Sequence, residues 1–276
     1  MTTIANLGFT PTVELIDVTP AMAGAWLAAN PHNRNPRRNV VAAYAADMSD
    51  GFWQFNGDTI RFATDGGLLD GQHRLAAIVE ADAVEACIVV RGLPWTAQET
   101  VDGGARRKFG DVLKLRGEVN AEHLSAILRR ITLWEMGSRR TELNIQPTNA
   151  QMSATLDKYG WVRDILHPAR AVADASGLTP SVVGACWWLF SRIDTEDCEH
   201  FMTQVRYGEG LKRRDPVYEL RAAIDRTRSG PYGSRSPVYL MAITIKAWNA
   251  YREGRQVQTI AYRAGGASPD RYPEPV

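Results

Sequence analysis

The chain has 276 residues, of which 45% are hydrophobic and 23% charged, and this is the composition of a soluble globular protein with one large or two small domains. No apolar run approaches the roughly 20 residues of a membrane helix, and the start MTTIANLGFT lacks the basic and apolar regions of a secretion signal, so we expect a cytoplasmic protein without membrane contact. The net charge of +1 argues against a protein that binds nucleic acid by overall charge alone.

The first predicted elements are a strand followed by two helices. Residues 13–18 mix apolar and acidic side chains as a half-buried strand does, and Thr19-Pro20 is a typical helix start. Helices are predicted at 21–29 and 36–49, the second with apolar residues at helical spacing.

The connection between these two helices is rich in prolines, asparagines and arginines. Residues 30–36 hold two prolines and three asparagines, which exclude regular structure. Arg34, Arg37 and Arg38 suit a loop that reaches over an anionic ligand, and they equally suit a solvated connector.

β-structure is predicted next. Asn56-Gly57 is a typical two-residue hairpin turn, which predicts a hairpin leading into a strand at 60–62. Gly66-Gly67 predicts a further turn before Leu68-Leu69 extends the chain again.

The most informative stretch is Asp70-Gly71-Gln72-His73-Arg74, at a predicted junction of strand and helix. A helix start offers unpaired backbone N–H groups and a partial positive charge, which together stabilise an anion. Gly71 allows a close backbone approach, and Gln72, His73 and Arg74 add hydrogen-bond donors. The sequence therefore predicts a phosphate site here. The alternative is a capped helix with Asp70 as N-cap and Arg74 paired to a carboxylate.

This stretch resembles the DGQHR-motif form of the ParB/sulfiredoxin superfamily, as found in phage ParB-like proteins, and the similarity extends over about residues 10 to 118. The resemblance implies a mixed α/β nucleotide-binding domain whose loop and helix hold the phosphates of ATP or CTP through Gly71, Gln72, His73 and Arg74. It also implies a helical second domain that contacts DNA. Gln72 stands where sulfiredoxin chemistry needs a cysteine, which argues against that reaction.

A second polar segment, DGGARRKFGD, follows the largely β-branched strand at 84–90. Asp102, Gly104 and Arg107 match a D-x-G-x-x-R pattern of the phage ParB-like relatives. If the segment folds over the first motif, Arg106 or Arg107 meets a phosphate and Asp102 binds Mg²⁺ or accepts a proton. Otherwise it is a basic surface turn.

From residue 119 onward the sequence predicts helices alone, with repeated Ser, Thr or Asp followed by Pro at their starts. We therefore predict an α+β protein made of an N-terminal ParB/sulfiredoxin-like mixed α/β domain at 1–118, an all-helical domain at 119–251 and an irregular tail at 252–276. The first part carries 11 Lys and Arg against 14 Asp and Glu, and the remainder 21 against 17. Cationic groups of the helical half could contact DNA or keep the surface soluble, and they are Arg129-Arg130, Arg139-Arg140, Lys212-Arg213-Arg214 and Arg226-Thr227-Arg228.

Three functions are compatible with these features. The first is a Mg²⁺-dependent NTPase or phosphotransferase in phage DNA modification or processing. Its candidate catalytic residues are Asp70, His73 and Asp102, and Asp70 and Asp102 are also the candidate metal ligands. Arg34 and Arg107 are further candidate contacts to the nucleotide. The second is a nucleotide-gated switch that binds DNA without turnover. The third is a ParB-like nuclease, which is disfavoured because no carboxylate cluster for two metal ions stands out. The sequence leaves the base preference, the phosphoryl acceptor and oligomerisation open.

Three cysteines, Cys87, Cys186 and Cys198, are unevenly spaced and include no CxxC pair. This spacing favours buried thiols over disulfides or a zinc site.

Overall fold

The computed structural model describes residues 9–29, 36–100, 108–139, 146–229, 236–266 and 268–276. The chain is an α+β protein that divides into two compact units, Met1–Arg107 (unit 1) and Lys108–Val276 (unit 2).

Unit 1 contains a four-stranded mixed sheet. Its described elements are β1 (Thr12–Val18), α1 (Pro20–Ala28), α2 (Arg38–Ser49), β2 (Thr59–Ala63), β3 (Leu68–Asp70), α3 (Gln72–Ala81), β4 (Glu85–Leu93) and the 3₁₀ helix η1 (Trp95–Thr100). The strand order is β1-β4-β2-β3, in which β2 and β4 are parallel and the other two pairs are antiparallel. Helix α1 starts as the sequence predicts, because the Thr19 side chain accepts a hydrogen bond from the Met22 amide and Pro20 occupies the first turn.

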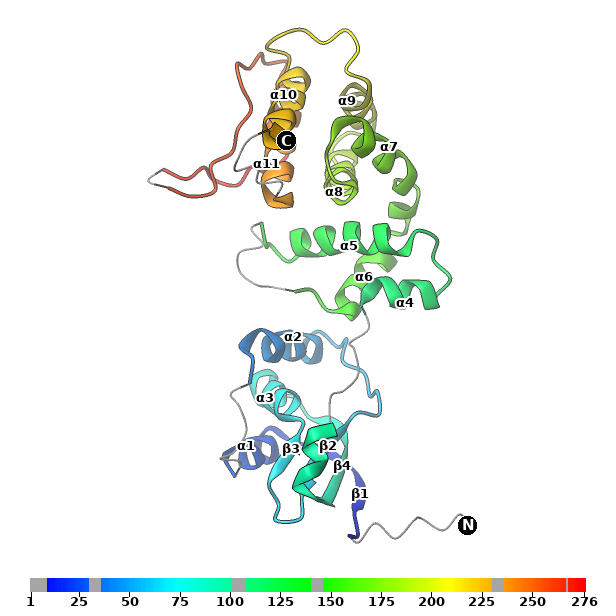
Figure 1. Ribbon diagram of the computed structural model, residues 1–276, viewed down its shortest axis with the longest axis vertical. Helices are drawn as coiled ribbons and strands as arrows, with labels where there is room; N and C mark the ends of the chain where they lie inside the picture. Colours follow the sequence, from blue (N-terminus) through cyan, green and yellow to red (C-terminus); the bar gives the residue numbers. More distant parts are fainter. Residues whose placement is uncertain (1–8, 30–35, 101–107, 140–145, 230–235, 267) are drawn as a thin grey trace. The chain divides into compact units, whose positions relative to one another are not determined.

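The core of unit 1 lies between the three helices and one face of the sheet (Figure 1). Ile60 and Val89 are fully buried on β2 and β4, and Leu75 and Ile78 are fully buried on α3. The β-branched run of β4 predicts a strand that is buried on both faces. In the structure, buried and half-exposed residues alternate along β4, so only one face of this strand is buried. Because α3 is packed in this core, the position of its first turn, which carries Gln72 and His73, is fixed.

All regular elements in the described residues of unit 2 are helices. Its elements are α4 (Phe109–Leu115), α5 (Ala121–Glu135), α6 (Asn149–Lys158), the 3₁₀ helix η3 (Gly160–Arg163), α7 (Leu166–Ser176), α8 (Pro180–Ser191), α9 (Thr195–Tyr207), α10 (Pro216–Ser229) and α11 (Pro237–Arg252). Helix α8 is central, as its apolar sequence predicts, and it packs against α5, α7, α9 and α11 (Figure 1). The Phe190 ring of α8 stacks on Trp248 of α11 with centroids 4.3 Å apart.

The division between the units falls earlier in the chain than the predicted domain end at 118. Helix α4 belongs to unit 2 because its Phe109 and Leu113 are buried in the core of that unit. The chain after α11 forms no helix or strand in its described part, yet Ile260 and Tyr272 are buried in the same core, so the segment is packed although it is irregular. Across the described ranges, no helix combines the length and the apolar character needed to cross a membrane.

Candidate functional site

The predicted strand, turn and helix of the Asp70–Arg74 stretch are all present. Strand β3 ends at Asp70, Gly71 is the N-cap residue of α3, and Gln72 opens the helix. Gly71 has φ of +106°, and a Cβ there would lie 3.1 Å from Cγ1 of Ile60 on β2. Glycine is therefore needed twice, for a left-handed backbone and for close packing against the neighbouring strand.

Asp70 and Arg74 bind one another and the sheet. Oδ1 of Asp70 accepts a 2.7 Å hydrogen bond from the Gly71 amide, and its Oδ2 lies 3.7 Å from the Arg74 guanidinium and 3.9 Å from that of Arg61. Arg74 donates a 2.7 Å hydrogen bond to the carbonyl of Thr59, and its side chain is only 13% exposed. In this arrangement Asp70 and Arg74 hold the turn against β2. The pairing of Arg74 with a carboxylate agrees with the capped-helix alternative, whereas Asp70 as N-cap was wrong, because Gly71 occupies that position and no described side chain caps the helix.

The buried thiol of Cys87 on β4 is within electrostatic reach of Arg74. Burial raises the pKa of Cys87, and the positive charge of Arg74 opposes that rise in part. The thiol therefore stays protonated at neutral pH.

His73 joins the start of α3 to the start of α2. Its Nε2 accepts a 3.1 Å hydrogen bond from the backbone N–H of Arg37, the N-cap residue of α2. An accepting nitrogen carries no proton, so in this hydrogen bond the imidazole acts through the lone pair of Nε2. Two helix N-termini, each with a partial positive charge, therefore meet at one hydrogen bond.

The electrostatics of these two helix starts favour an anion. Neither α2 nor α3 has an acidic residue in its first turn, and neither helix has a side-chain capping hydrogen bond at its N-cap. Arg37 and Arg38 are exposed at the start of α2. The side chain of Gln72 is half-buried and makes no hydrogen bond to any residue that the structure describes, so its amide is available as a donor. Backbone amides, two guanidinium groups and a carboxamide are groups that could hold a phosphate group.

The predicted site residues thus separate into two groups. Asp70, Gly71 and Arg74 shape the turn, whereas Gln72 and His73 lie at the two helix starts together with Arg37 and Arg38. In the sequence, the basic residues before α2 and the glycine before α3 pointed to these two helix starts. The sequence did not predict the hydrogen bond between Arg37 and His73, because these residues are 36 positions apart.

Three of the predicted site residues, Arg34, Asp102 and Arg107, lie outside the described residues. Among the residues that the structure does describe, no group of three His, Cys, Asp or Glu side chains could hold a metal ion. Both oxygens of Asp70 face an amide or guanidinium groups, so this carboxylate does not fit a magnesium ligand as it stands.

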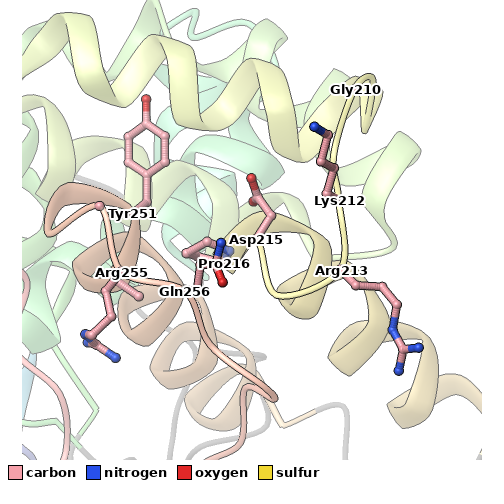
Figure 2. A pocket seen from close by; sticks show the side chains of 10 residues that line it. Gly210, Lys212, Arg213, Asp215, Pro216, Tyr251, Arg255 and Gln256 are labelled. Atoms are coloured by element: carbon pink, nitrogen blue, oxygen red, sulfur yellow. The ribbon is translucent and has the colours of Figure 1, made fainter.

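Unit 2 contains a separate cavity of about 310 Å³ between the loop after α9 and the end of α11, which includes part of the Lys212–Arg214 cationic group (Figure 2). Figure 2 shows Lys212 and Asp215 extending toward the same side, while Arg213 and Arg255 point away from each other. Asp215 caps α10 by accepting a 2.8 Å hydrogen bond from the Val217 amide. The cations lining this cavity therefore do not converge on one point.

No protein-family model, curated protein or solved structure matches this chain. The resemblance to the ParB/sulfiredoxin superfamily accordingly rests on the motif residues of the sequence.

Proposed function

We propose that unit 1 binds the phosphates of a nucleotide, ATP or CTP, between the first turns of α2 and α3. The observation that carries this proposal is the meeting of two uncapped helix N-termini at the hydrogen bond from Arg37 to His73, with exposed arginines beside it. Each helix start contributes backbone N–H groups and a partial positive charge, and the arginines add the full charges that a polyphosphate requires.

In this proposal the residues of the motif have distinct tasks. Gly71 and the contacts of Arg74 with Thr59 and Asp70 hold the turn in place. Gln72 and the first-turn amides contact phosphate oxygens, and His73 positions the two helices relative to each other. Arg37 and Arg38 neutralise the charge of the phosphates.

The first use of such a site is phosphoryl transfer or NTP hydrolysis in DNA modification or processing. This chemistry depends mainly on placing the phosphates and stabilising their developing charge, which helix starts and arginines do. Mg²⁺ would arrive with the nucleotide and supply further charge neutralisation. The described carboxylate, Asp70, is already bound to arginines, so a metal ligand or base would have to come from Asp102.

The second use is a switch, in which the bound nucleotide changes how the protein contacts DNA without being consumed. One observation favours it, because the described residues of the site supply anion-binding groups while their carboxylate is engaged. In both uses, DNA contact is proposed for the helical unit 2.

The decisive experiment measures binding and turnover together. The full chain is incubated with Mg²⁺ and each labelled NTP, with and without DNA, and bound nucleotide, released phosphate and labelled DNA are quantified. We expect saturable binding that falls about tenfold or more in Arg37→Gln/Arg38→Gln, because charged hydrogen bonds are lost. The matched control is Arg116→Gln, an exposed arginine of unit 2, which should bind as the wild type does.

Turnover then separates the two uses. Phosphate release or transfer to DNA supports the enzyme, and stoichiometric binding without release supports the switch. Failure of all four NTPs to bind at millimolar concentration would remove the proposal.

A further inference from the structure

Two adjacent arginines of α5, Arg129 and Arg130, are half-buried without a neutralising partner. The Nε of Arg130 donates a 3.0 Å hydrogen bond to the hydroxyl of Ser181 on α8. Within the described part of the chain, neither guanidinium has a carboxylate within 4.0 Å. The remaining N–H groups of Arg130, which form a rigid fork, therefore have no described acceptor.

Three other half-buried cations of unit 2, Arg139, Lys246 and Arg221, do have acceptors. Arg139 binds Glu274 at 2.7 Å, and Lys246 binds Asp270 at 2.7 Å. Arg221 donates to the backbone carbonyls of Val205 and Arg206. Because removing a cation from water is unfavourable unless an acceptor replaces the water, the arginine pair on α5 stands apart from these residues.

The electrostatic surroundings of Arg129 and Arg130 also disfavour their positive charges. Burial lowers the pKa of both Arg129 and Arg130, and the charge of Arg129 lowers that of Arg130 further. Both groups nevertheless remain charged at neutral pH, since the guanidinium of arginine titrates only at a pH of about 12 or above. An anion between them would relieve the repulsion between the two cations.

The start of α8 contributes two hydroxyl groups, one of which contacts Arg130. Thr179 is the N-cap residue of α8, and its hydroxyl lies 3.4 Å from that of Ser181. The first turn of α8 contains no acidic residue and no side-chain cap. The arginine pair is thus accompanied by two hydroxyl groups and by the positive end of a helix dipole.

We propose that Arg129 and Arg130, together with Ser181, form a phosphate-binding site in unit 2, separate from the nucleotide site of unit 1. Phosphate fits this chemistry because its several oxygens can accept from both guanidinium groups and from a hydroxyl at once. The phosphate could come from a nucleic-acid strand or from a small phosphorylated molecule, and the test has an arm for each source.

The test uses the full chain and two probes, a labelled single-stranded oligonucleotide followed by anisotropy and inorganic pyrophosphate followed by calorimetry. Arg129→Gln/Arg130→Gln is compared with wild type and with Arg170→Gln/Arg271→Gln, which removes the same charge from exposed positions on α7 and in the C-terminal segment. All measurements are repeated with Arg37→Gln/Arg38→Gln added, so that binding by unit 1 and binding by unit 2 are read separately.

We expect the double variant on α5 to lose about tenfold or more in affinity, while the exposed double variant changes little. Loss for the oligonucleotide, with the salt slope falling by about one for each lost phosphate contact, identifies a nucleic-acid strand. Loss for pyrophosphate alone identifies a small ligand. Equal affinities of the α5 variant and the wild type for both probes would overturn the proposal.

A second measurement needs no variant and so does not depend on folding of the mutants. Wild-type protein is treated with phenylglyoxal, which modifies arginine, and its peptides are analysed by mass spectrometry. We expect oligonucleotide or pyrophosphate to protect Arg129 and Arg130 from modification. Unchanged modification at both positions with saturating probe would contradict the site.

Discussion

The backbone N–H of Arg37 donates a 3.1 Å hydrogen bond to Nε2 of His73, and this single contact links the first turns of α2 and α3 in unit 1. Neither first turn contains an acidic residue, and the carboxylate of Asp70, directly before α3, is paired with Arg61 and Arg74. The positive ends of the two helices therefore have no counter-charge within their own first turns. The proposed phosphate site follows from this relationship.

The first prediction concerns His73. His73→Ala removes the ring nitrogen that accepts from the Arg37 amide, so α2 and α3 lose the hydrogen bond that links their first turns. Because a hydrogen bond of this kind contributes about 0.5–1.5 kcal/mol, we expect nucleotide affinity to fall roughly threefold to tenfold.

Calorimetric titration with ATP or CTP and Mg²⁺ measures this change in affinity. His200→Ala, at an exposed histidine of α9, is the control and should bind as the wild type does. Equal nucleotide affinity of wild type and His73→Ala would contradict the role given to His73.

The second prediction concerns Gly71. Replacement by alanine forces a side chain into a left-handed conformation and brings its Cβ to 3.1 Å from Ile60, so we expect unit 1 to lose about 1–3 kcal/mol of stability. Gly24 lies inside α1, where a Cβ would have no neighbouring atom within 4 Å, and Gly24→Ala should instead stabilise by up to about 1 kcal/mol. Urea unfolding of both variants measures whether the free energy of unfolding changes in opposite directions. A lower stability of Gly24→Ala would contradict the open space found at this position of α1.

The third prediction separates shaping the turn from contacting the ligand. Arg74→Ala leaves the carbonyl of Thr59 without its donor and removes one charge from beside Asp70, so it should destabilise unit 1 by about 1–3 kcal/mol and abolish nucleotide binding. Arg37→Gln/Arg38→Gln should weaken binding with stability nearly unchanged, because these side chains are exposed. Urea unfolding and nucleotide titration of the same samples give the comparison. Full nucleotide affinity in Arg74→Ala would show that the pocket lies elsewhere.

The fourth prediction concerns the thiols. Burial raises the pKa of Cys198 to about 12 and moves the pKa values of Cys87 and Cys186 upward as well. Since the thiolate is the reactive form, native Cys198 should react with a disulfide reagent at pH 8 about a thousandfold more slowly than free cysteine. All three cysteines should react at once in denaturant. A rapidly reacting thiol in the native protein would disagree with this burial.

Much of unit 1 could be predicted because the relevant signals are local. The turn at Gly66-Gly67, the extended Leu68-Leu69 and the helix after Gly71 are all observed, since glycines at positive φ and a change of periodicity need no tertiary information. The helix start at Thr19-Pro20 is confirmed for the same reason.

The hairpin predicted at Asn56-Gly57 was wrong. Residues 52–58 form no strand, and the Asn56 side chain instead accepts a 2.9 Å hydrogen bond from the Asp58 amide. Strand β2 pairs with β3 and β4, which leaves no place for a preceding strand at its edge. A turn signal gives the local conformation, but the pairing of strands is decided by the rest of the sheet.

The roles within the candidate site were the hardest to predict. Sequence alone could not show that Arg74 would turn toward the Thr59 carbonyl rather than toward a ligand, because that depends on where β2 passes beneath the loop. For the same reason it could not bring Arg37 to His73. The chemistry of the residues was visible in the sequence, and their division into those that shape the turn and those that face a ligand was not.

The central claim is that nucleotide phosphates bind where α2 and α3 begin, and hydrogen exchange tests this location most directly. Exchange of the full chain is followed by mass spectrometry with and without saturating ATP or CTP and Mg²⁺. The account predicts slower exchange in peptides that contain the first turns of both helices, with the effect lost in Arg37→Gln/Arg38→Gln. Nucleotide binding that leaves exchange at both helix starts unchanged would contradict it.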